Sequence, residues 1–436
     1  MEKFSRKSTT NNLSPASKAF MCLRFPLSFL FVLLSTISFY DQSWCASMTE
    51  EESEESLLSL PYIQYVETEK APNKVGTTIY NKDKASSGYN IYTFDDLMGN
   101  ASIPLINMDG VLIHQWTTNL SNVTAKWYQA TPFPDGSIFL TSKLTRIDWQ
   151  RLNVNSHSMA IYDMPKQKAH HAAYCLKKGG FLGLVENRIH VPFQDLKIKI
   201  RDNSFVQLSS NGQPLKTIPL SKLLSKDPGY QERLKKAYDY LKKHNKHKNN
   251  EPLFDLFHAN NIENLEWDIP GIAKKGSWLI TVKHLDRIFI VDPEKETILW
   301  QWGENIISKP HHATFLKDGR ILLLDNGVAQ KSSRVIELDI KSKTIVWQYG
   351  QKPNQEFFTL QRGSAQRLQN GNTLIVESNQ GRVFEVTLSG EIVWEWYAEF
   401  FTEGKNKGKR RIIYRMERLP YDFFKNVKFN HGKPQP

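Results

Sequence analysis

The chain has 436 residues, of which 40% are hydrophobic and 23% charged, and a formal net charge of +12. This length exceeds one ordinary hydrophobic core, which excludes a single small domain and predicts two domains or one large domain built from repeats. The basic charge favours anionic partners without choosing between nucleic acid, membrane and small acidic substrates. The three cysteines show no Cys-x-x-Cys or Cys/His zinc spacing, which argues against a structural zinc site.

Residues 1–46 are predicted to be a signal peptide or a signal anchor. Basic residues precede an apolar segment at 25–40 that is shorter than the roughly 20 residues that span a bilayer. We favour a cleaved signal peptide, which places the body on the extracytoplasmic side: secreted, periplasmic or in the lumen of the secretory pathway. An uncleaved leader would anchor the protein to the membrane. Residues 47–100 are predicted to be an acidic linker and an N-terminal lead-in.

Three tight turns lie in similar surroundings, at 128–142, 311–326 and 363–378. Each has a short strand, an Asp-Gly or Asn-Gly pair that suits a hairpin, and an apolar strand. A second pair of strands follows and ends in Trp-x-aromatic, as at 286–303. The repeated unit of four antiparallel strands, about 45–55 residues long, is typical of a β-propeller blade, and its aromatics are expected to fill the interfaces between blades.

Six innermost strands predict an all-β fold, a six-bladed propeller over residues 101–425. They start near Gln129, His171, His258, His312, Ser364 and residue 412. The last blade is expected to combine residues 103–117 with 412–420, so that both ends of the chain close the ring. Residues 220–252 predict a short helical insertion, either a lid or a solvated excursion without a role. Residues 426–436 are expected to form a C-terminal tail.

The first residue of each innermost strand is expected to point into the central channel. His171, His258 and His312 occupy this position in three blades, so they predict one funnel lined by imidazoles. His170 and His311 come one residue earlier, and strand alternation predicts that they face away and pack or hydrogen-bond between strands.

The segments DLFHANNIENL (255–265), SWLITVKHLDRIFIVD (277–292) and HHATFLKDGRILLLDNG (311–327) resemble the arylsulfotransferase family. Its members are PAPS-independent, extracytoplasmic six-bladed propellers. The resemblance implies an enzyme that moves a sulfuryl group from a phenolic sulfate ester to a phenol through a histidine. It implies phenols and aryl sulfates as partners and no cofactor. We expect no nucleic acid partner, and a membrane partner only if the leader is uncleaved.

The resemblance also implies site residues. His258 matches the family's Asp-x-x-His-x-Asn histidine. The catalytic set is expected to be His258, His284, His312 and Arg334. Arg334, or Lys331, stands in for an arginine that the family carries after its Asp-Asn-Gly turn. Residues expected to bind substrate are His171, Asn260, Lys283, Asn326, Ser364 and Arg362.

The family's sulfuryl-accepting histidine has no counterpart, because Ser364 occupies the next axial position and no histidine follows His312 before His431. Either His312 or His258 serves instead, or activity is lost. An alternative is therefore a non-catalytic propeller that binds an anionic aromatic ligand or a partner. A further alternative is a zinc or copper site made by His171, His258 and His312. We expect no metal, since the resemblance offers a metal-free account.

Overall fold

The computed structural model places all described residues in one compact unit, Glu54–Pro436. The described residues are 57, 73–94, 102–117, 126–143, 148–164, 167–246, 251–401 and 407–429. The predicted leader, most of the linker and residues 430–436 of the predicted tail lie outside this set. Within the described residues, no helix has the length and apolar character needed to cross a membrane.

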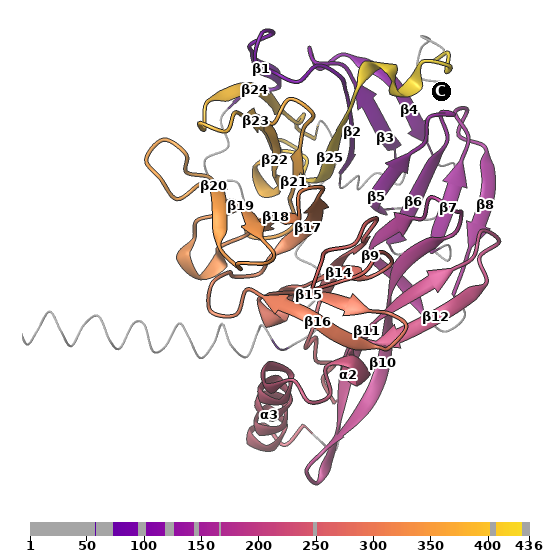
Figure 1. Cartoon of the computed structure of the whole chain (residues 1–436), viewed down its shortest axis with the longest axis vertical. Helices are drawn as coiled ribbons and strands as arrows, with labels where there is room; N and C mark the ends of the chain where they lie inside the picture. The colour runs from indigo at the N-terminus through magenta and orange to yellow at the C-terminus, as the bar shows by residue number, and fades with distance from the viewer. Residues whose placement is uncertain are drawn as a thin grey trace, which may run out of the picture. The chain divides into compact units, whose positions relative to one another are not determined.

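Six antiparallel sheets form a ring, which confirms the predicted six-bladed β-propeller (Figure 1). Contacts between innermost strands run in a closed cycle from each blade to the next. The innermost strands are β25 (Ile413–Leu419) in blade I, β5 (Lys126–Pro132) in II, β9 (Lys168–Cys175) in III, β13 (Ala259–Asn264) in IV, β17 (His311–Leu316) in V and β21 (Ser364–Arg367) in VI.

The other strands follow outward in each blade. The second strands are β2 (Tyr89–Phe94), β6 (Ile138–Lys143), β10 (Phe181–Phe193), β14 (Trp278–Val282), β18 (Arg320–Asp325) and β22 (Thr373–Glu377). The third strands are β3 (Ser102–Ile106), β7 (Trp149–Leu152), β11 (Leu196–Leu208), β15 (Arg287–Asp292), β19 (Arg334–Asp339) and β23 (Arg382–Val386). The outer strands are β4 (Leu112–Thr117), β8 (Ser158–Tyr162), β12 (Pro214–Pro219), β16 (Thr297–Trp302), β20 (Ile345–Tyr349) and β24 (Ile392–Tyr397).

Blade I joins the two ends of the chain, as predicted. C-terminal β25 pairs with β2, and β3 and β4 follow outward. Two strands come from the segment expected to be a lead-in: β2, and β1 (Gly76–Tyr80), which adds a fifth strand to blade VI beside β24. Arg418 of β25 lies at this closure, buried against Glu385 of blade VI, and its Nε donates to Asn90 Oδ1 of β2 at 2.7 Å.

The repeated tryptophans link neighbouring blades, as the aromatic pattern predicts. Three outer-strand indoles donate Nε1–H to a backbone carbonyl in a turn of the next blade: Trp300 to Ile340, Trp347 to Leu388 and Trp394 to Met108. Their distances are 2.9, 2.8 and 2.8 Å. All three contacts fix one blade against the next, and those of Trp300 and Trp394 also satisfy the N–H of a buried indole.

The insertion is packed on the propeller and is not a solvated excursion. Helices α2 (Leu220–Leu223) and α3 (Pro228–Lys243) follow β12. The carboxylate of Asp227 caps α3 by accepting from the backbone N–H of Tyr230 at 3.0 Å. The Tyr230 ring packs on Phe257 with their centroids 4.7 Å apart. Since Phe257 directly precedes His258, the insertion supports the segment that carries this histidine.

Candidate functional site

The innermost strands begin with irregular backbone, and this places the candidate residues. The pairing register shifts near the start of β9, β13 and β17, as in a β-bulge. His171, His258 and His312 have left-handed φ values of 58°, 47° and 51°. Strict alternation therefore fails at these positions, and neighbouring side chains can turn to the same side.

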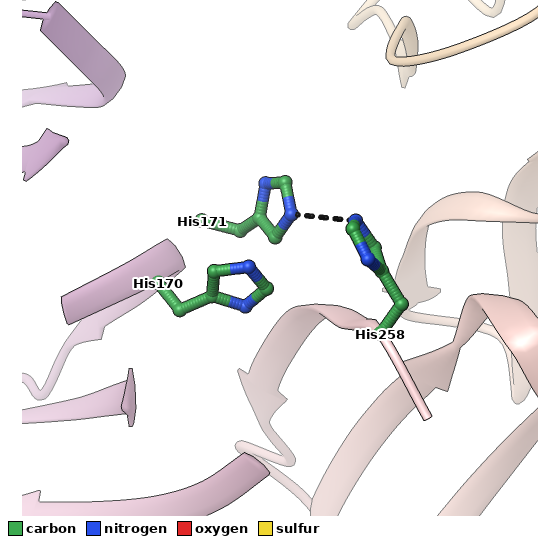
Figure 2. A group of neighbouring side chains, drawn as sticks. All are labelled: His170, His171 and His258. Carbon is green, nitrogen blue, oxygen red and sulfur yellow. Dashed lines mark hydrogen bonds between the residues drawn. The ribbon is translucent and has the colours of Figure 1, made fainter. Parts of the chain in front are cut away.

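His171 and His258 meet at the mouth of the channel. Their Nε2 atoms lie 3.2 Å apart (Figure 2). The ring of His170 joins them, with centroids 4.1 Å from His171 and 5.4 Å from His258. The convergence of His171 and His258 follows the sequence pattern. The position of His170 does not, because the bulge in β9 brings its ring beside the other two.

Asp255 organises the His258 side of this cluster. Its carboxylate lies 2.6 Å from His258 Nδ1 and accepts from the His258 backbone N–H at 3.1 Å. Burial would raise the pKa of Asp255, but the attraction of His258 and His284 outweighs it and holds the pKa well below the usual range. Burial lowers the pKa of His258 although Asp255 opposes this effect. We therefore assign a neutral His258 that donates Nδ1–H to Asp255 and presents the Nε2 lone pair to His171.

His284 and Lys283 reach the same region from a short 3-10 turn, η1 (Lys283–Leu285), which follows β14. His284 Nδ1 lies 2.7 Å from the backbone oxygen of Asp255. Burial lowers the pKa of Lys283 to about 8, and Asp255 opposes this. The channel mouth thus combines an ionised aspartate with a readily deprotonated lysine and several imidazoles.

Asn326 connects the mouth to blade VI through backbone groups. Its Oδ1 accepts from His311 Nδ1 at 2.7 Å, and its Nδ2 donates to the carbonyl of Arg362 at 3.0 Å. His311 Nε2 accepts in turn from the Arg362 N–H at 3.3 Å, so His311 bonds between strands as predicted. The Arg362 guanidinium lies 4.3 Å from the centroid of the Tyr414 ring. Both polar atoms of the Asn326 side chain are therefore hydrogen-bonded to residues that it orients.

His312 lines a cavity inside the channel. The cavity has a volume of about 450 Å³, and its polar lining includes Gln129, Glu263, Ser364, Arg415 and Glu417. The cavity lining starts at Ala173 on β9, two residues after His171. On β13 it starts at Asn261, three residues after His258.

The protonation state of His312 follows from its surroundings. Its Nδ1 lies 3.1 Å from the carbonyl oxygen of Ala365 and must donate to it. Burial lowers the pKa of His312 well below its ordinary value, and Arg415 adds to this effect. The imidazole is therefore neutral, and the lone pair is on Nε2, which makes no hydrogen bond with the described residues.

Two further polar groups line the cavity close to His312 in the ring. Arg415 on β25 donates from Nη2 to Asn261 Oδ1 at 2.8 Å, and burial lowers its pKa to about 10. Ser364 is 2% exposed, and within the described chain its Oγ has no hydrogen-bond partner. The cavity thus holds a fixed cation and a hydroxyl with unused bonding capacity.

Two carboxyl groups of the cavity were not predicted from the sequence. Burial raises the pKa of Glu263 to about 8, and nearby Glu266 adds to the rise. Glu417 is exposed to the channel, and desolvation there raises its pKa to about 7, with Arg415 opposing. Both lie two residues after another cavity-lining residue on an innermost strand, Asn261 and Arg415. The period-2 pattern of these strands is the signal that would have found them.

The raised pKa of Glu263 predicts a pH-dependent stability. In the unfolded chain this group ionises above its ordinary pKa of 4.5, whereas in the folded protein it stays protonated up to about pH 8. Stability is therefore lost as pH rises from about 4.5 to 8. Glu263→Gln keeps an acceptor for the Phe315 N–H and should add on the order of 2 kcal/mol at pH 8 but little at pH 4.

Urea unfolding at the two pH values measures this difference. Glu356→Gln, which removes an exposed carboxylate, serves as the matched control and should show no such change. An equal gain at both pH values in Glu263→Gln would contradict the assignment.

Two predicted site residues have structural partners. The Arg334 guanidinium donates to Asp325 Oδ2 at 2.9 Å, the Ile306 carbonyl at 2.7 Å and Gln348 Oε1 at 3.4 Å, so it holds the Asp-Asn-Gly turn. Asn260 donates from Nδ2 to the Pro310 carbonyl at 2.8 Å and so links blades IV and V.

These contacts separate the predicted residues into three groups. His258, Lys283 and His284 lie around Asp255 at the mouth, where His171 contacts His258, and His312 and Ser364 line the cavity. Asn326 and Arg362 are joined through His311. Arg415, a residue that the sequence pattern did not single out, lines the cavity together with the basic residues Lys177 and Arg367. Arg334 has its partners in the turn, and Lys331 is exposed.

One family model matches part of the chain. The family model described as arylsulfotransferase (ASST) matches residues 190–400, which confirms the resemblance seen in the sequence. No curated protein matches the chain.

Solved structures give only distant likenesses. A protein of unknown function from Bacteroides caccae is 13% identical, with 76% of this chain and 98% of that chain covered and a TM-score of 0.49. A catalytically inactive virginiamycin B lyase from Staphylococcus aureus with quinupristin is 14% identical, with coverage of 64% and 72% and a TM-score of 0.36. A streptogramin B lyase is 11% identical, with coverage of 80% and 100% and a TM-score of 0.43. We draw nothing about activity from these three.

Proposed function

From an arylsulfotransferase family match over residues 190–400, we propose that this protein moves a sulfuryl group from a phenolic sulfate ester to a phenol inside the channel cavity. The observation that carries the proposal is the state of His312. A neutral imidazole with Nδ1–H fixed on a carbonyl and Nε2 without a hydrogen bond to the described residues is a competent nucleophile near pH 7.

His312 is a better candidate nucleophile than His258. The Nε2 of His258 already faces the Nε2 of His171 at 3.2 Å, so an attack from it requires that contact to break. His312 needs no such rearrangement, and it lines a cavity whose volume suits a small aromatic ester.

The remaining cavity groups suit sulfuryl transfer. His312 Nε2 attacks sulfur, the bond from sulfur to the aryl oxygen breaks, and the electron pair leaves with that oxygen. Arg415 and the Ser364 hydroxyl are placed to donate to the sulfuryl oxygens. Protonated Glu417 supplies the proton that the leaving aryl oxide needs, and it regains a proton from the acceptor phenol, which then attacks the sulfohistidine.

A purified-protein assay tests the proposed function. With 4-nitrophenyl sulfate as donor, we expect release of 4-nitrophenol only when a phenol is added, together with the sulfated acceptor detected by mass spectrometry. Binding of 4-nitrophenyl sulfate without release, over a panel of phenols, would overturn the enzymatic function and favour the non-catalytic propeller.

Replacing Glu417 tests the proton transfer. Glu417→Gln is expected to lower kcat about 10²-fold with phenyl sulfate, whose leaving group is poor, and much less with 4-nitrophenyl sulfate. In the unchanged protein kcat should fall as pH rises through about 7, because the raised pKa keeps Glu417 protonated only below that value. Equal losses with both donors, or an unchanged pH profile in the variant, would show that Glu417 is not the acid.

The proposed location remains extracytoplasmic, with the leader either cleaved or kept as an anchor. N-terminal sequencing of the protein recovered from its native host distinguishes these two forms.

A further inference from the structure

We propose that the mouth of the channel binds one divalent transition-metal ion, of the zinc or copper class, through His170, His171 and His258. One ring nitrogen of each histidine lies within 4.8 Å of the others (Figure 2). This set differs from the one considered from the sequence, because His312 lines the cavity and His170 takes the third place. The proposed metal site goes beyond the transfer reaction, and His312 is not one of its ligands.

The distance between His171 and His258 fits a shared ion. Two imidazole nitrogens that bind one tetrahedral zinc at about 2.0–2.1 Å are about 3.3 Å apart. The observed separation of the two Nε2 atoms is 3.2 Å. A hydrogen bond between them also fits this distance, but then His171 must carry the proton on Nε2, since Asp255 accepts from His258 Nδ1. A metal ion would take the place of that proton between the two Nε2 atoms.

Carboxylates lie beside two of the three rings, those of His258 and His170. Asp255 Oδ2 lies 2.6 Å from His258 Nδ1, which is the carboxylate–histidine arrangement that fixes a ligand's tautomer in metal sites. Glu186 Oε2 lies 3.7 Å from His170 Nε2, and Arg201 binds this carboxylate at 2.6 Å. Asp255, His258 and His284 form a second group of the same kind around the shared His258. Asp255 therefore supplies negative charge beside the position that the ion would take, whereas the charge of Glu186 is balanced by Arg201.

The backbone also points to a functional constraint. Non-glycine residues with left-handed φ cost about 1 kcal/mol each, and both His171 and His258 adopt it. The bulge in β9 turns consecutive histidines toward one point, which a regular strand cannot do. These distortions bring three imidazoles from two neighbouring blades together at a cost in strain, as expected where side-chain placement matters more than local stability.

Metal titration of the untagged, full-length protein tests the site. After chelator treatment, zinc chloride should bind at one equivalent in calorimetry, and copper(II) should show nitrogen ligation in its EPR spectrum. His171→Ala should weaken zinc binding about 100-fold, and Asp255→Asn about 10-fold or more. His171→Gln provides a second variant if the first unfolds, and thermal melting checks both.

Two controls separate this site from the transfer reaction. His190→Ala removes an exposed imidazole from β10, and His312→Ala removes the proposed nucleophile; both should bind zinc as the unchanged protein does. The absence of saturable zinc binding, or unchanged affinity in both His171 variants, overturns the metal site whatever the transfer assay shows. Loss of transfer in His312→Ala with zinc binding intact would confirm that the two sites are independent.

Discussion

Replacing His312 with alanine should lower kcat for aryl sulfate transfer by about 10³-fold or more, because the variant lacks the imidazole proposed to attack sulfur. His312 is neutral, its Nδ1–H is held by the Ala365 carbonyl, and its Nε2 has no competing bond in the described chain. The initial rate of phenol-dependent 4-nitrophenol release measures the effect. The sulfohistidine that mass spectrometry should detect in alkali-quenched wild-type protein should also disappear.

His190→Ala is the matched control, because it deletes an imidazole whose side chain is 51% exposed on the extended hairpin of blade III. Its rate should equal that of the unchanged protein. If His312→Ala keeps its activity while His258→Ala loses it, the nucleophile is the histidine bound to Asp255 and the reaction takes place at the mouth.

Replacing Arg418 with methionine should destabilise the fold by about 3–5 kcal/mol. The side chains of Arg418 and Glu385 are 2% and 0% exposed, so the variant leaves a buried carboxylate without its charge partner. It also removes a hydrogen bond to Asn90 that joins β25 to β2. Denaturation in guanidinium chloride, followed by tryptophan fluorescence, measures the loss.

Lys84→Met is the control for this experiment. Lys84 and Glu391 form an ion pair near the same closure, but their side chains are 50% and 47% exposed. Such a pair contributes at most about 1 kcal/mol, so the control should remain close to the unchanged protein. The double variant Arg418→Met, Glu385→Gln should recover part of the stability, and equal losses in Arg418→Met and Lys84→Met would contradict a buried closure contact.

The architecture could be predicted from the sequence because its signals are local and repeated. Gly136, Gly319 and Gly371 of the predicted hairpin turns have φ values of 78°, 79° and 88°, which the Asp-Gly and Asn-Gly pairs foretell. The length of the repeat and the residues of its turns together predict the number of blades. Strand β1 was missed because it has no counterpart in the other blades, and its register is fixed only by pairing with β24.

The site was predictable only in part, and the reason is geometrical. An axial histidine is predictable from its place in the repeat, which is why His171 and His258 were expected to converge. His170 was expected to face away, since alternation rules assume a regular strand and a bulge leaves no mark in the sequence. Glu417 was missed because its importance comes from its place in the channel cavity beside Arg415, and this placement is not a property of the neighbouring sequence.

Strand β25 closes the ring and also carries Arg415 and Glu417 into the cavity. During synthesis the ribosome delivers this strand after every other strand of the propeller has left it. A nascent chain that stops before residue 413 lacks the cation and the acid, however well its first five blades have formed. The proposed transfer reaction therefore requires that β25 has paired into blade I. The transfer rate of a preparation measures the fraction of molecules in which the ring is closed.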